Sequence, residues 1–518
     1  MRLIDFFDKG AALGTGRTCL IDLEGRSLSY GETQRLTHRI GNGLIDAKVG
    51  AQRAAAVLSP NEMYAFVCIL GILRSGASWM PVNARNAMAE NISIMADNDC
   101  EFLFYHSSFA ADAEAIRAGV PTLKGMVCID RPNGADPDLQ GWMAEASDAE
   151  CHVPAGPHDI ACYWPSGGTT GRSKGILLTH LNFETMIANF AAAINYRSSP
   201  PVHLMAAPMT HAAGCVAFPT LVAGGTQVVS PNADALTVMQ AIEQHKVTTL
   251  FLPPTVIYTM LGHPRVRAFD YSSLRHMIYA AAPMSAAKLA EAIEVFGPVM
   301  TQTFGQAESP MICTFMSPEE HIVADTPESR KRLTSCGRAS MFTQLAIMDD
   351  EGRLLPDGEA GEIVVRGNLV MKGYYKNPAA TEEASRFGWH HTGDIGMRDE
   401  DGYFYIVDRK RDMIISGGFN IYPSEIEQVL WAHPAVEDCA VIGVPDEKWG
   451  EAVKAVIQLK ADADAAPSDF EQFCRSRLGG MKTPKSFEIW DALPRSPVGK
   501  VLKRTIRDRF WAGRSRSV

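Results

Sequence analysis

The chain has 518 residues, of which 46% are hydrophobic and 21% are charged, and its formal net charge is −10 at pH 7. This composition is typical of a globular protein with room for several domain-sized cores, and the acidic balance argues against a nucleic-acid or anionic-membrane partner. Eleven cysteines are present without any Cys-x-x-Cys pair, which favours reduced thiols in a cytoplasm over disulfides or zinc.

The beginning of the chain is acidic where a signal peptide would be basic and then apolar. The longest apolar run, residues 64–73, is too short to span a bilayer. We therefore expect a buried helix at this run, no transmembrane segment and a cytoplasmic location.

The first 300 or so residues alternate extended and helical patterns, which indicates doubly wound sheets covered by helices. The expected strands are residues 54–58, 77–82, 101–105, 126–129, 202–207, 225–229, 248–252, 277–281 and 299–303. The expected helices are residues 30–46, 60–74, 109–118, 181–195, 234–245 and 285–296.

A glycine-rich loop interrupts this alternation. Its sequence is Tyr163-Trp-Pro-Ser-Gly-Gly-Thr-Thr-Gly-Arg-Ser-Lys-Gly175, and the residues on both sides, 160–164 and 175–179, are strand-like. Freed backbone amides, small hydroxyls and one ammonium are suited to holding a polyphosphate. The loop lacks the Gly-Lys-Ser/Thr ending of a Walker A loop. A glycine-rich hairpin without function is the plain alternative.

The pattern of predicted secondary structure changes in the last third of the chain. Residues 335–407 are rich in short extended stretches and Asp-Gly turns, which indicates a small β subdomain. From residue 411 a compact α+β tail follows, with a helix at 423–432, a hairpin across 436–460 and a helix at 467–478. We therefore expect an α/β protein with a large N-terminal domain, residues 1–410, and a small mobile C-terminal domain, residues 411–518.

Two acidic residues have the surroundings of ligand-binding groups. Glu308 ends the run Phe304-Gly-Gln-Ala-Glu308 after a strand, where α/β sheets bind ligands, and a carboxylate beside phosphates is suited to Mg²⁺. Asp394, in His390-His-Thr-Gly-Asp394, can accept two hydrogen bonds from a ribose diol. Each of them taken alone also fits a solvated turn.

Three further segments carry candidate residues. The charged run Asp408-Arg-Lys-Arg-Asp412 precedes the glycine-containing Ser416-Gly-Gly-Phe-Asn420, and Pro494-Arg-Ser-Pro-Val-Gly-Lys500 places one lysine after a flexible glycine. Pro208-Met-Thr-His-Ala-Ala-Gly214 sets His211 among small residues, as if a ligand passed close to the backbone. A solvated charged face, a surface lysine and a structural histidine are the respective alternatives.

Taken together and in this order, these motifs resemble the adenylate-forming superfamily of acyl-CoA synthetases, luciferases and peptide-synthetase adenylation domains. The resemblance runs from about residue 28 to residue 505. It implies ATP, Mg²⁺ and CoA as cofactors and co-substrates, with a carboxylic acid as the substrate. The residues that it implies for cofactor binding are Ser166, Gly168, Thr169, Thr170, Gly171, Lys174, Ala281, Ala282, Pro283, Thr303, Phe304, Gly305, Asp394, Arg409, Gly417 and Gly418.

The resemblance also assigns roles within this set. Glu308 and Thr170 belong to the magnesium site, and Asp394 with Arg409 to the ribose site. Lys500 matches the catalytic lysine of adenylation, with Glu308, Thr170 and His211 as the other expected catalytic residues. Arg411 falls at the hinge between the two domains.

The sequence departs from the family's pattern in a few places. Gly167 replaces a common Ser or Thr, Ser173 stands where Pro is usual, and Phe304 replaces Tyr. The most serious departure is Ala307, where Thr is common beside the magnesium glutamate. A neutral hydrogen bond is worth about 0.5–1.5 kcal/mol, so its loss would slow adenylation several-fold without abolishing it.

The family mechanism implies transfer of a carboxylate to the α-phosphorus of ATP, release of pyrophosphate, and attack of CoA on the acyl-adenylate. Ala212 stands where amino-acid-activating domains carry Asp, which favours an uncharged acid that is medium-to-long-chain or bulky and aromatic. A stand-alone enzyme that loads a carrier protein and a non-catalytic nucleotide-binding regulator remain alternatives, and a luciferase-like oxygenase is a remote third. The sequence leaves open a homodimer and acetylation of Lys500.

Overall fold

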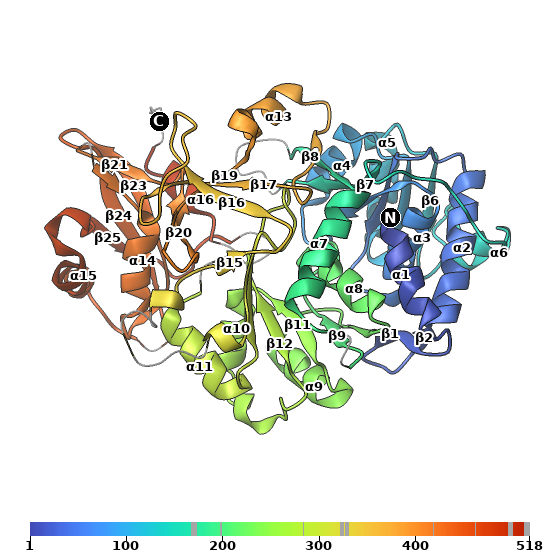
Figure 1. Cartoon of the computed structure of the whole chain (residues 1–518), viewed down its shortest axis with the longest axis horizontal. Coiled ribbons are helices and arrows are strands. Elements are labelled where there is room, and N and C mark those ends of the chain that lie inside the picture. Colours follow the sequence, from blue (N-terminus) through green and yellow to red (C-terminus); the bar gives the residue numbers. More distant parts are fainter. Residues whose placement is uncertain are drawn as a thin grey trace.

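The structure is a computed structural model that describes residues 1–166, 173–196, 199–282, 284–321, 326, 331–417, 419–461, 463–495 and 501–511. Three sheets and their helices form a large N-terminal part, and a fourth sheet with its helices forms a smaller C-terminal part at the opposite end of the molecule from α1 and α2 (Figure 1). The predicted α/β class, with a large N-terminal domain of several sheets and a smaller C-terminal domain, is confirmed.

The first sheet has seven strands in the order β18-β8-β7-β4-β3-β5-β6, with a parallel centre and antiparallel β8 and β18 at one edge. Its strands are β3 (Ala54–Leu58), β4 (Ser78–Val82), β5 (Phe102–Tyr105), β6 (Gly125–Cys128), β7 (Ile160–Pro165), β8 (Gly175–Thr179) and β18 (Gly373–Tyr374). The helices of this region are α2 (Tyr30–Asp46), α3 (Met63–Arg74), α4 (Met88–Asp97), η1 (Ser107–Asp112), α5 (Ala113–Gly119) and α6 (Leu139–Ala144).

The apolar run at 64–73 lies within α3 and is almost wholly buried, as predicted. Within the described ranges no helix combines the length and apolarity that crossing a bilayer requires. All eleven cysteines are buried as free thiols.

The second sheet has nine strands in the order β15-β14-β13-β12-β11-β9-β10-β1-β2. Its strands are β1 (Thr18–Asp22), β2 (Ser27–Ser29), β9 (Val202–Met205), β10 (Thr226–Val229), β11 (Thr249–Leu252), β12 (His276–Tyr279), β13 (Met300–Phe304), β14 (Thr314–Met316) and β15 (Arg338–Ala339). The associated helices are α1 (Leu3–Ala12), α7 (His180–Ala193), α8 (Ala212–Val222), α9 (Ala235–His245), α10 (Pro254–Leu261), η2 (Val266–Ala268), α11 (Ala286–Phe296) and η3 (Glu319–His321).

The two faces of this sheet belong to two separate cores, because successive side chains of a strand point to opposite faces. Met205, Phe251 and Ile278 join the largest core, which also contains most of α8. Leu250 and Met277 join a second core with α9, α10 and α11. The face that meets α8 is therefore the one that looks towards the interior of the N-terminal part.

The remaining strands form two smaller sheets. The third sheet has the order β16-β17-β19-β20; its elements are β16 (Gln344–Met348), β17 (Gly361–Arg366), α13 (Pro378–Ala384), η4 (Arg386–Gly388), β19 (His390–Arg398) and β20 (Phe404–Arg409). The C-terminal sheet has the order β22-β21-β24-β23, with β25 paired to β24; its elements are β21 (Ile414–Ser416), β22 (Phe419–Ile421), α14 (Pro423–Trp431), β23 (Val436–Asp446), β24 (Gly450–Leu459), α15 (Pro467–Lys482), β25 (Ser486–Ile489) and α16 (Lys503–Asp508).

The segment 335–407 differs in one respect from the single β subdomain that we expected. Only β16, β17, β19 and β20 form the four-stranded sheet, whereas β15 extends the nine-stranded sheet and β18 extends the seven-stranded one. The segment therefore ties three sheets together. The strand β18 is only two residues long, and its pairing with β8 carries no local sequence signal.

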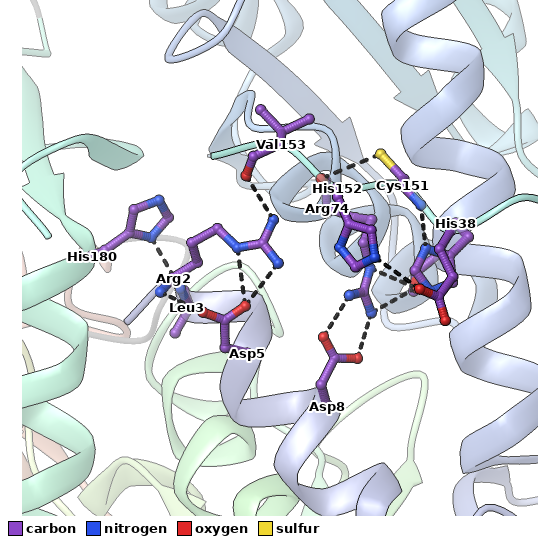
Figure 2. A network of polar contacts seen from close by, with 12 residues as sticks. Arg2, Leu3, Asp5, Asp8, His38, Arg74, Cys151, His152, Val153 and His180 are labelled. Atoms are coloured by element: carbon purple, nitrogen blue, oxygen red, sulfur yellow. Dashed lines mark hydrogen bonds and ion pairs between the residues drawn. The ribbon is translucent and has the colours of Figure 1, made fainter. Parts of the chain in front are cut away.

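A buried arginine joins α1, α2 and α3 to the segment that leads into β7 (Figure 2). Arg74 is 2% exposed, and its two terminal nitrogens lie 2.5 and 2.7 Å from the carboxylate oxygens of Asp8. Thr37 accepts a further bond from this guanidinium, the Cys151 thiol donates to the Arg74 carbonyl, and the Cys151 amide donates to His38. Burial by itself would raise the pKa of Asp8, but the Arg74 guanidinium holds it below its usual value.

We predict that Asp8→Asn lowers the free energy of unfolding by roughly 2–4 kcal/mol, because it leaves a buried guanidinium without its counter-charge. The matched control is Glu294→Gln, which removes the partner of Arg267 from an ion pair that is exposed on both sides and should cost less than about 0.5 kcal/mol. Urea denaturation at pH 7 compares the two variants. Equal losses would show that the Asp8–Arg74 pair contributes no more than a surface pair.

Candidate active site

The ends of the glycine-rich loop are tied together at its base. The strands β7 and β8 pair antiparallel up to Pro165 and Gly175. Ser166 accepts a bond from the Lys174 amide on its hydroxyl and donates its own amide to the Lys174 carbonyl, both at 2.8 Å. Ser173, which stands where the family usually has Pro, donates to the Ser166 carbonyl at 2.7 Å. The predicted strand–loop–strand turn is thus present, and its base presents Lys174.

Other loop residues lie outside the described part of the chain. These are four of the expected phosphate-loop residues, Gly168, Thr169, Thr170 and Gly171. Pro283, Gly418 and Lys500 are likewise outside it. Their roles remain predictions.

Glu308 lies close to this hairpin through a tyrosine that the sequence analysis did not single out. The Tyr374 hydroxyl donates to Glu308 Oε1 at 2.8 Å, and Lys174 Nζ stands 4.8 Å from the centre of the Tyr374 ring. Burial, and then the Glu308 charge, raise the pKa of Tyr374. The phenol therefore keeps its proton and acts as a hydrogen-bond donor.

The residues expected at the ribose meet in a second cluster. Asp394 is 2% exposed, and its Oδ1 lies 2.6 Å from Arg409 Nε across the β19–β20 ladder. Gln306 donates from Nε2 to Asp394 Oδ2 at 2.9 Å and to the Thr392 carbonyl at 2.7 Å. These bonds orient the Asp394 carboxylate beside Arg409 and Gln306.

The two clusters are joined by one turn. Gln306 and Ser309 bond each other through their backbones, at 3.0 Å from the Gln306 amide and 3.3 Å from the Ser309 amide. The side chains of Gln306 and Glu308 leave this turn towards Asp394 and Tyr374, respectively. The turn follows the carboxyl end of β13, where parallel sheets bind ligands.

Strained backbone and close packing occur where β12 and β13 end. Ala281 follows β12 with φ of +74°, and Met311 near the end of β13 has φ of +65°. Gly305 has no room for a side chain, because a Cβ would lie 2.7 Å from the Met311 backbone. Thr303 is buried, and its hydroxyl has no hydrogen-bond partner among the residues that the structure describes. Strained residues of this kind cluster at ligand sites.

His211 lies beside β7, one of the two strands that carry the glycine-rich loop. It immediately precedes α8, and its ring makes an edge contact with Trp164 of β7 at 6.2 Å between ring centres. Its Nδ1 is 3.2 Å from the Thr210 hydroxyl. Gly214 lets α8 approach the Met209 backbone, because a Cβ would lie 1.9 Å from the Met209 carbonyl oxygen.

The two ends of the stretch 496–500 are paired with each other and held to the C-terminal part. Arg495 pairs with Val501 as an antiparallel bridge, and the Leu502 amide donates to the Pro494 carbonyl at 2.8 Å. Lys503 then forms a buried ion pair with Glu427 at 2.8 Å. In the glycine-containing loop, Gly417 has φ of +59°.

The donor set fits a magnesium ion held mainly by nucleotide phosphates. Mg²⁺ is usually bound through one or two carboxylates together with phosphate oxygens and water. Glu308 supplies such a carboxylate, with Oε1 oriented by Tyr374, and within the described ranges no cluster of three or more His, Cys, Asp or Glu suits a metal held by protein alone.

Comparison with protein families identifies two matching models. The model described as AMP-binding enzyme matches residues 7–375, and the model described as AMP-binding enzyme C-terminal domain matches residues 425–500.

Individual proteins agree with these matches. A feruloyl-CoA synthase from Amycolatopsis sp is 37% identical over 494 residues, which covers 94% of each chain. A medium/long-chain-fatty-acid–CoA ligase from Mycobacterium tuberculosis is 39% identical over 360 residues, which covers 68% of this chain and 62% of that relative. The structure of the amide bond synthetase McbA from Marinactinospora thermotolerans superposes with a TM-score of 0.89 at 28% identity, covering 98% of this chain and 100% of that one.

The order of the motifs, the sheets that carry them and these matches agree with one another. The chain is an enzyme that belongs to the AMP-binding enzyme family, the adenylate-forming superfamily that the sequence predicts.

Proposed function

We propose that this enzyme is an AMP-forming acid–thiol ligase, an acyl-CoA synthetase for a hydrophobic carboxylic acid. The observation that carries the proposal is the turn after β13, which orients Asp394 through Gln306 and places Glu308 beside Tyr374 and the phosphate hairpin. This arrangement fits ATP lying across the carboxyl ends of the strands. The free, buried cysteines fit a reducing, cytoplasmic compartment.

In the first step, a carboxylate oxygen of the acid bonds to the α-phosphorus of ATP, and the bond from that phosphorus to the bridging oxygen of pyrophosphate breaks. The acid is already an anion, so no general base is required. Negative charge develops on the α-phosphate and pyrophosphate, and Lys174 and Lys500 stabilise it. Glu308, together with the phosphates, would hold a magnesium ion, which would supply further charge neutralisation when bound.

In the second step, the CoA thiolate bonds to the acyl carbon, and AMP leaves with the electron pair of the broken acyl–oxygen bond. Lys500 belongs to the C-terminal part beyond Arg411. Rotation near Arg411 would replace Lys500 by the Gly417–Gly418 loop, whose glycines let a pantetheine arm pass close to the backbone.

The surroundings of His211 support an uncharged acyl group. Ala212 provides no carboxylate for an ammonium, and the face of the nine-stranded sheet that meets α8 carries Met205, Phe251 and Ile278, all buried. The names of the relatives, a feruloyl-CoA synthase and a medium/long-chain-fatty-acid–CoA ligase, also favour an aromatic or fatty acid.

The acceptor is the point at which the main alternative differs. The fold neighbour McbA is named as an amide bond synthetase, so this fold does not by itself select CoA. A stand-alone enzyme that loads a carrier protein would use the same adenylation site. The presence of Lys174, Glu308 and Lys500 argues against a non-catalytic regulator.

We predict acid-dependent pyrophosphate release with hydroxycinnamic or medium-to-long-chain acids, and acyl-CoA formation when CoA is added. A pyrophosphate-release screen over chain length and ring type, with and without CoA, checks both half-reactions, and mass spectrometry identifies the thioester. Release of pyrophosphate without any thioester would favour a carrier protein as acceptor. Absence of release with every acid would overturn the proposed function.

We predict that Lys500→Ala slows adenylate formation by about 10²–10³-fold, the usual effect of removing one group that stabilises transition-state charge. The variant should still convert supplied acyl-AMP and CoA to the thioester at nearly the wild-type rate. Lys460→Ala, which removes an exposed lysine from the same part of the chain, is the control. An equal loss in both half-reactions would contradict the two-position role of Lys500.

We predict that His211→Ala raises the KM for the acid about 2–10-fold, the value of one lost hydrogen bond, while the KM for ATP stays within twofold. Steady-state kinetics with the preferred acid tests this, with the exposed His152→Ala as the control. Unchanged values for both substrates would show that the carboxylate lies elsewhere.

A further inference from the structure

We propose that Tyr374 is a positioning residue that orients the magnesium carboxylate Glu308 and keeps it apart from the phosphate-hairpin lysine, Lys174. This inference deepens the proposed function and rests on it, because it assigns Glu308 and Lys174 to the same nucleotide. Its basis is the double contact of one side chain. The hydroxyl of Tyr374 bonds Glu308, and the ring of Tyr374 faces Lys174.

The backbone fixes Tyr374 relative to both groups. Strand β18 pairs with β8, so that Tyr374 stands opposite Ile176, two residues after Lys174. Immediately after Tyr374, the Tyr375 amide donates to the Gly175 carbonyl at 2.7 Å. On the other side, the Met371 amide donates to the Glu308 carbonyl at 2.7 Å. One short segment is therefore hydrogen-bonded to the main chain at Glu308 and at the hairpin.

The strand itself is held in place from outside. The Tyr374 amide donates to the Thr381 hydroxyl at 2.9 Å. Gly373 has φ of +148°, and a Cβ there would lie 2.8 Å from the Thr381 side chain. The ring of Tyr374 is thus placed by backbone bonds on both edges and does not depend on the nucleotide.

The electrostatic consequence follows from the charges on either side of the ring. Glu308 and Lys174 carry opposite charges. In the proposed function Glu308 binds the magnesium ion of the nucleotide, and Lys174 contacts its phosphates. An ion pair between them would neutralise both. Across the described residues no ion pair links Glu308 with Lys174, and each instead contacts Tyr374. The cation–π contact holds the ammonium without neutralising it.

The hydrogen bond has a second effect. It ties Glu308 Oε1 to the phenol, so the carboxylate has a fixed orientation before any ligand binds. Tyr374 is not expected to touch the reacting atoms, and its contribution is to ligand affinity rather than to the chemistry.

The test is Tyr374→Phe, which keeps the ring over Lys174 and removes the bond to Glu308. A hydrogen bond to a charged group predicts that the Mg²⁺ concentration for half-maximal binding of ATP, measured by calorimetry without any acid present, rises roughly ten- to 150-fold. ATP binding without Mg²⁺ should stay within twofold of the wild type. In kinetics, the maximal rate should return to within threefold of the wild type at high Mg²⁺.

Tyr375→Phe is the matched control, because its hydroxyl bonds Asp99 at 2.7 Å from the neighbouring position of the same segment and touches neither Glu308 nor Lys174. It should leave the Mg²⁺ dependence unchanged. In a Glu308→Gln background, Tyr374→Phe should have no further effect on that dependence. Melting temperatures of all variants separate loss of folding from loss of binding.

Three results would overturn the proposal. These are a Tyr374→Phe enzyme with wild-type Mg²⁺ dependence, an equal shift in Tyr375→Phe, or a full additional shift on top of Glu308→Gln. Failure of the proposed function gives a different result. A wild-type enzyme that binds ATP with Mg²⁺ but never releases pyrophosphate would refute the proposed function, and the role of Tyr374 could still be tested by the Mg²⁺ dependence of ATP binding in calorimetry. A wild-type enzyme that binds no ATP at any Mg²⁺ concentration would overturn both.

Discussion

The turn from Gln306 to Ser309 is the constraint on which the arrangement of the site depends. Backbone hydrogen bonds join Gln306 and Ser309. The side chain of Gln306 bonds Asp394, and that of Glu308 bonds Tyr374. A nucleotide spanning both clusters would have its ribose and its metal held by groups whose separation is set within four residues. Such a short connection limits the relative movement of the two clusters, and precise placement is what phosphoryl-group chemistry most needs from a protein.

The charges at the site explain why Lys174 is kept apart from the carboxylates around it. The proposed reaction would concentrate negative charge, and the chain as a whole carries −10. A cation that is to contact the phosphates must therefore not be neutralised by a neighbouring carboxylate. Arg409 is paired with Asp394 at 2.6 Å, where the expected ligand is a neutral sugar. Lys174, expected at the phosphates, contacts an aromatic ring instead.

The sequence predicted the regular elements well wherever they are governed by local periodicity. The central strands and the helices between them lie within a few residues of the predicted ranges, and the glycine-rich turn has the predicted strand on each side. Helix α8 was not predicted, because it is buried on nearly all sides and contains Pro219, so it lacks the polar face that gives a helix its period. The segments that form β15 and β18 were predicted to belong to the small β subdomain, whereas they extend the nine-stranded and the seven-stranded sheets. Pairing between short strands that are distant in the sequence leaves no local pattern.

The candidate site was predictable in its charged residues and not in the residues that orient them. Glu308, Asp394, Arg409 and Lys174 stand in recognisable motifs, and the structure places them in two adjacent clusters. Gln306 and Tyr374 could not be assigned from the sequence, because their partners are 88 and 66 residues away. A tyrosine beside glycine in a turn-rich segment is ordinary, and its meaning comes only from the strand pairing that brings it to Glu308.

The surroundings of the undescribed stretch 496–500 limit how Lys500 can take part in two steps. Arg495 is held by Asp438 at 2.6 Å and by its bridge to Val501, and Lys503 is held by the buried carboxylate of Glu427. Breaking a buried ion pair of this kind by removing a partner costs about 3–5 kcal/mol. A movement of residues 495–503 away from the rest of the C-terminal part would have to break the contacts to Asp438 and Glu427. Rotation of the whole C-terminal part keeps them, and it is therefore the less costly movement for the exchange proposed for Lys500.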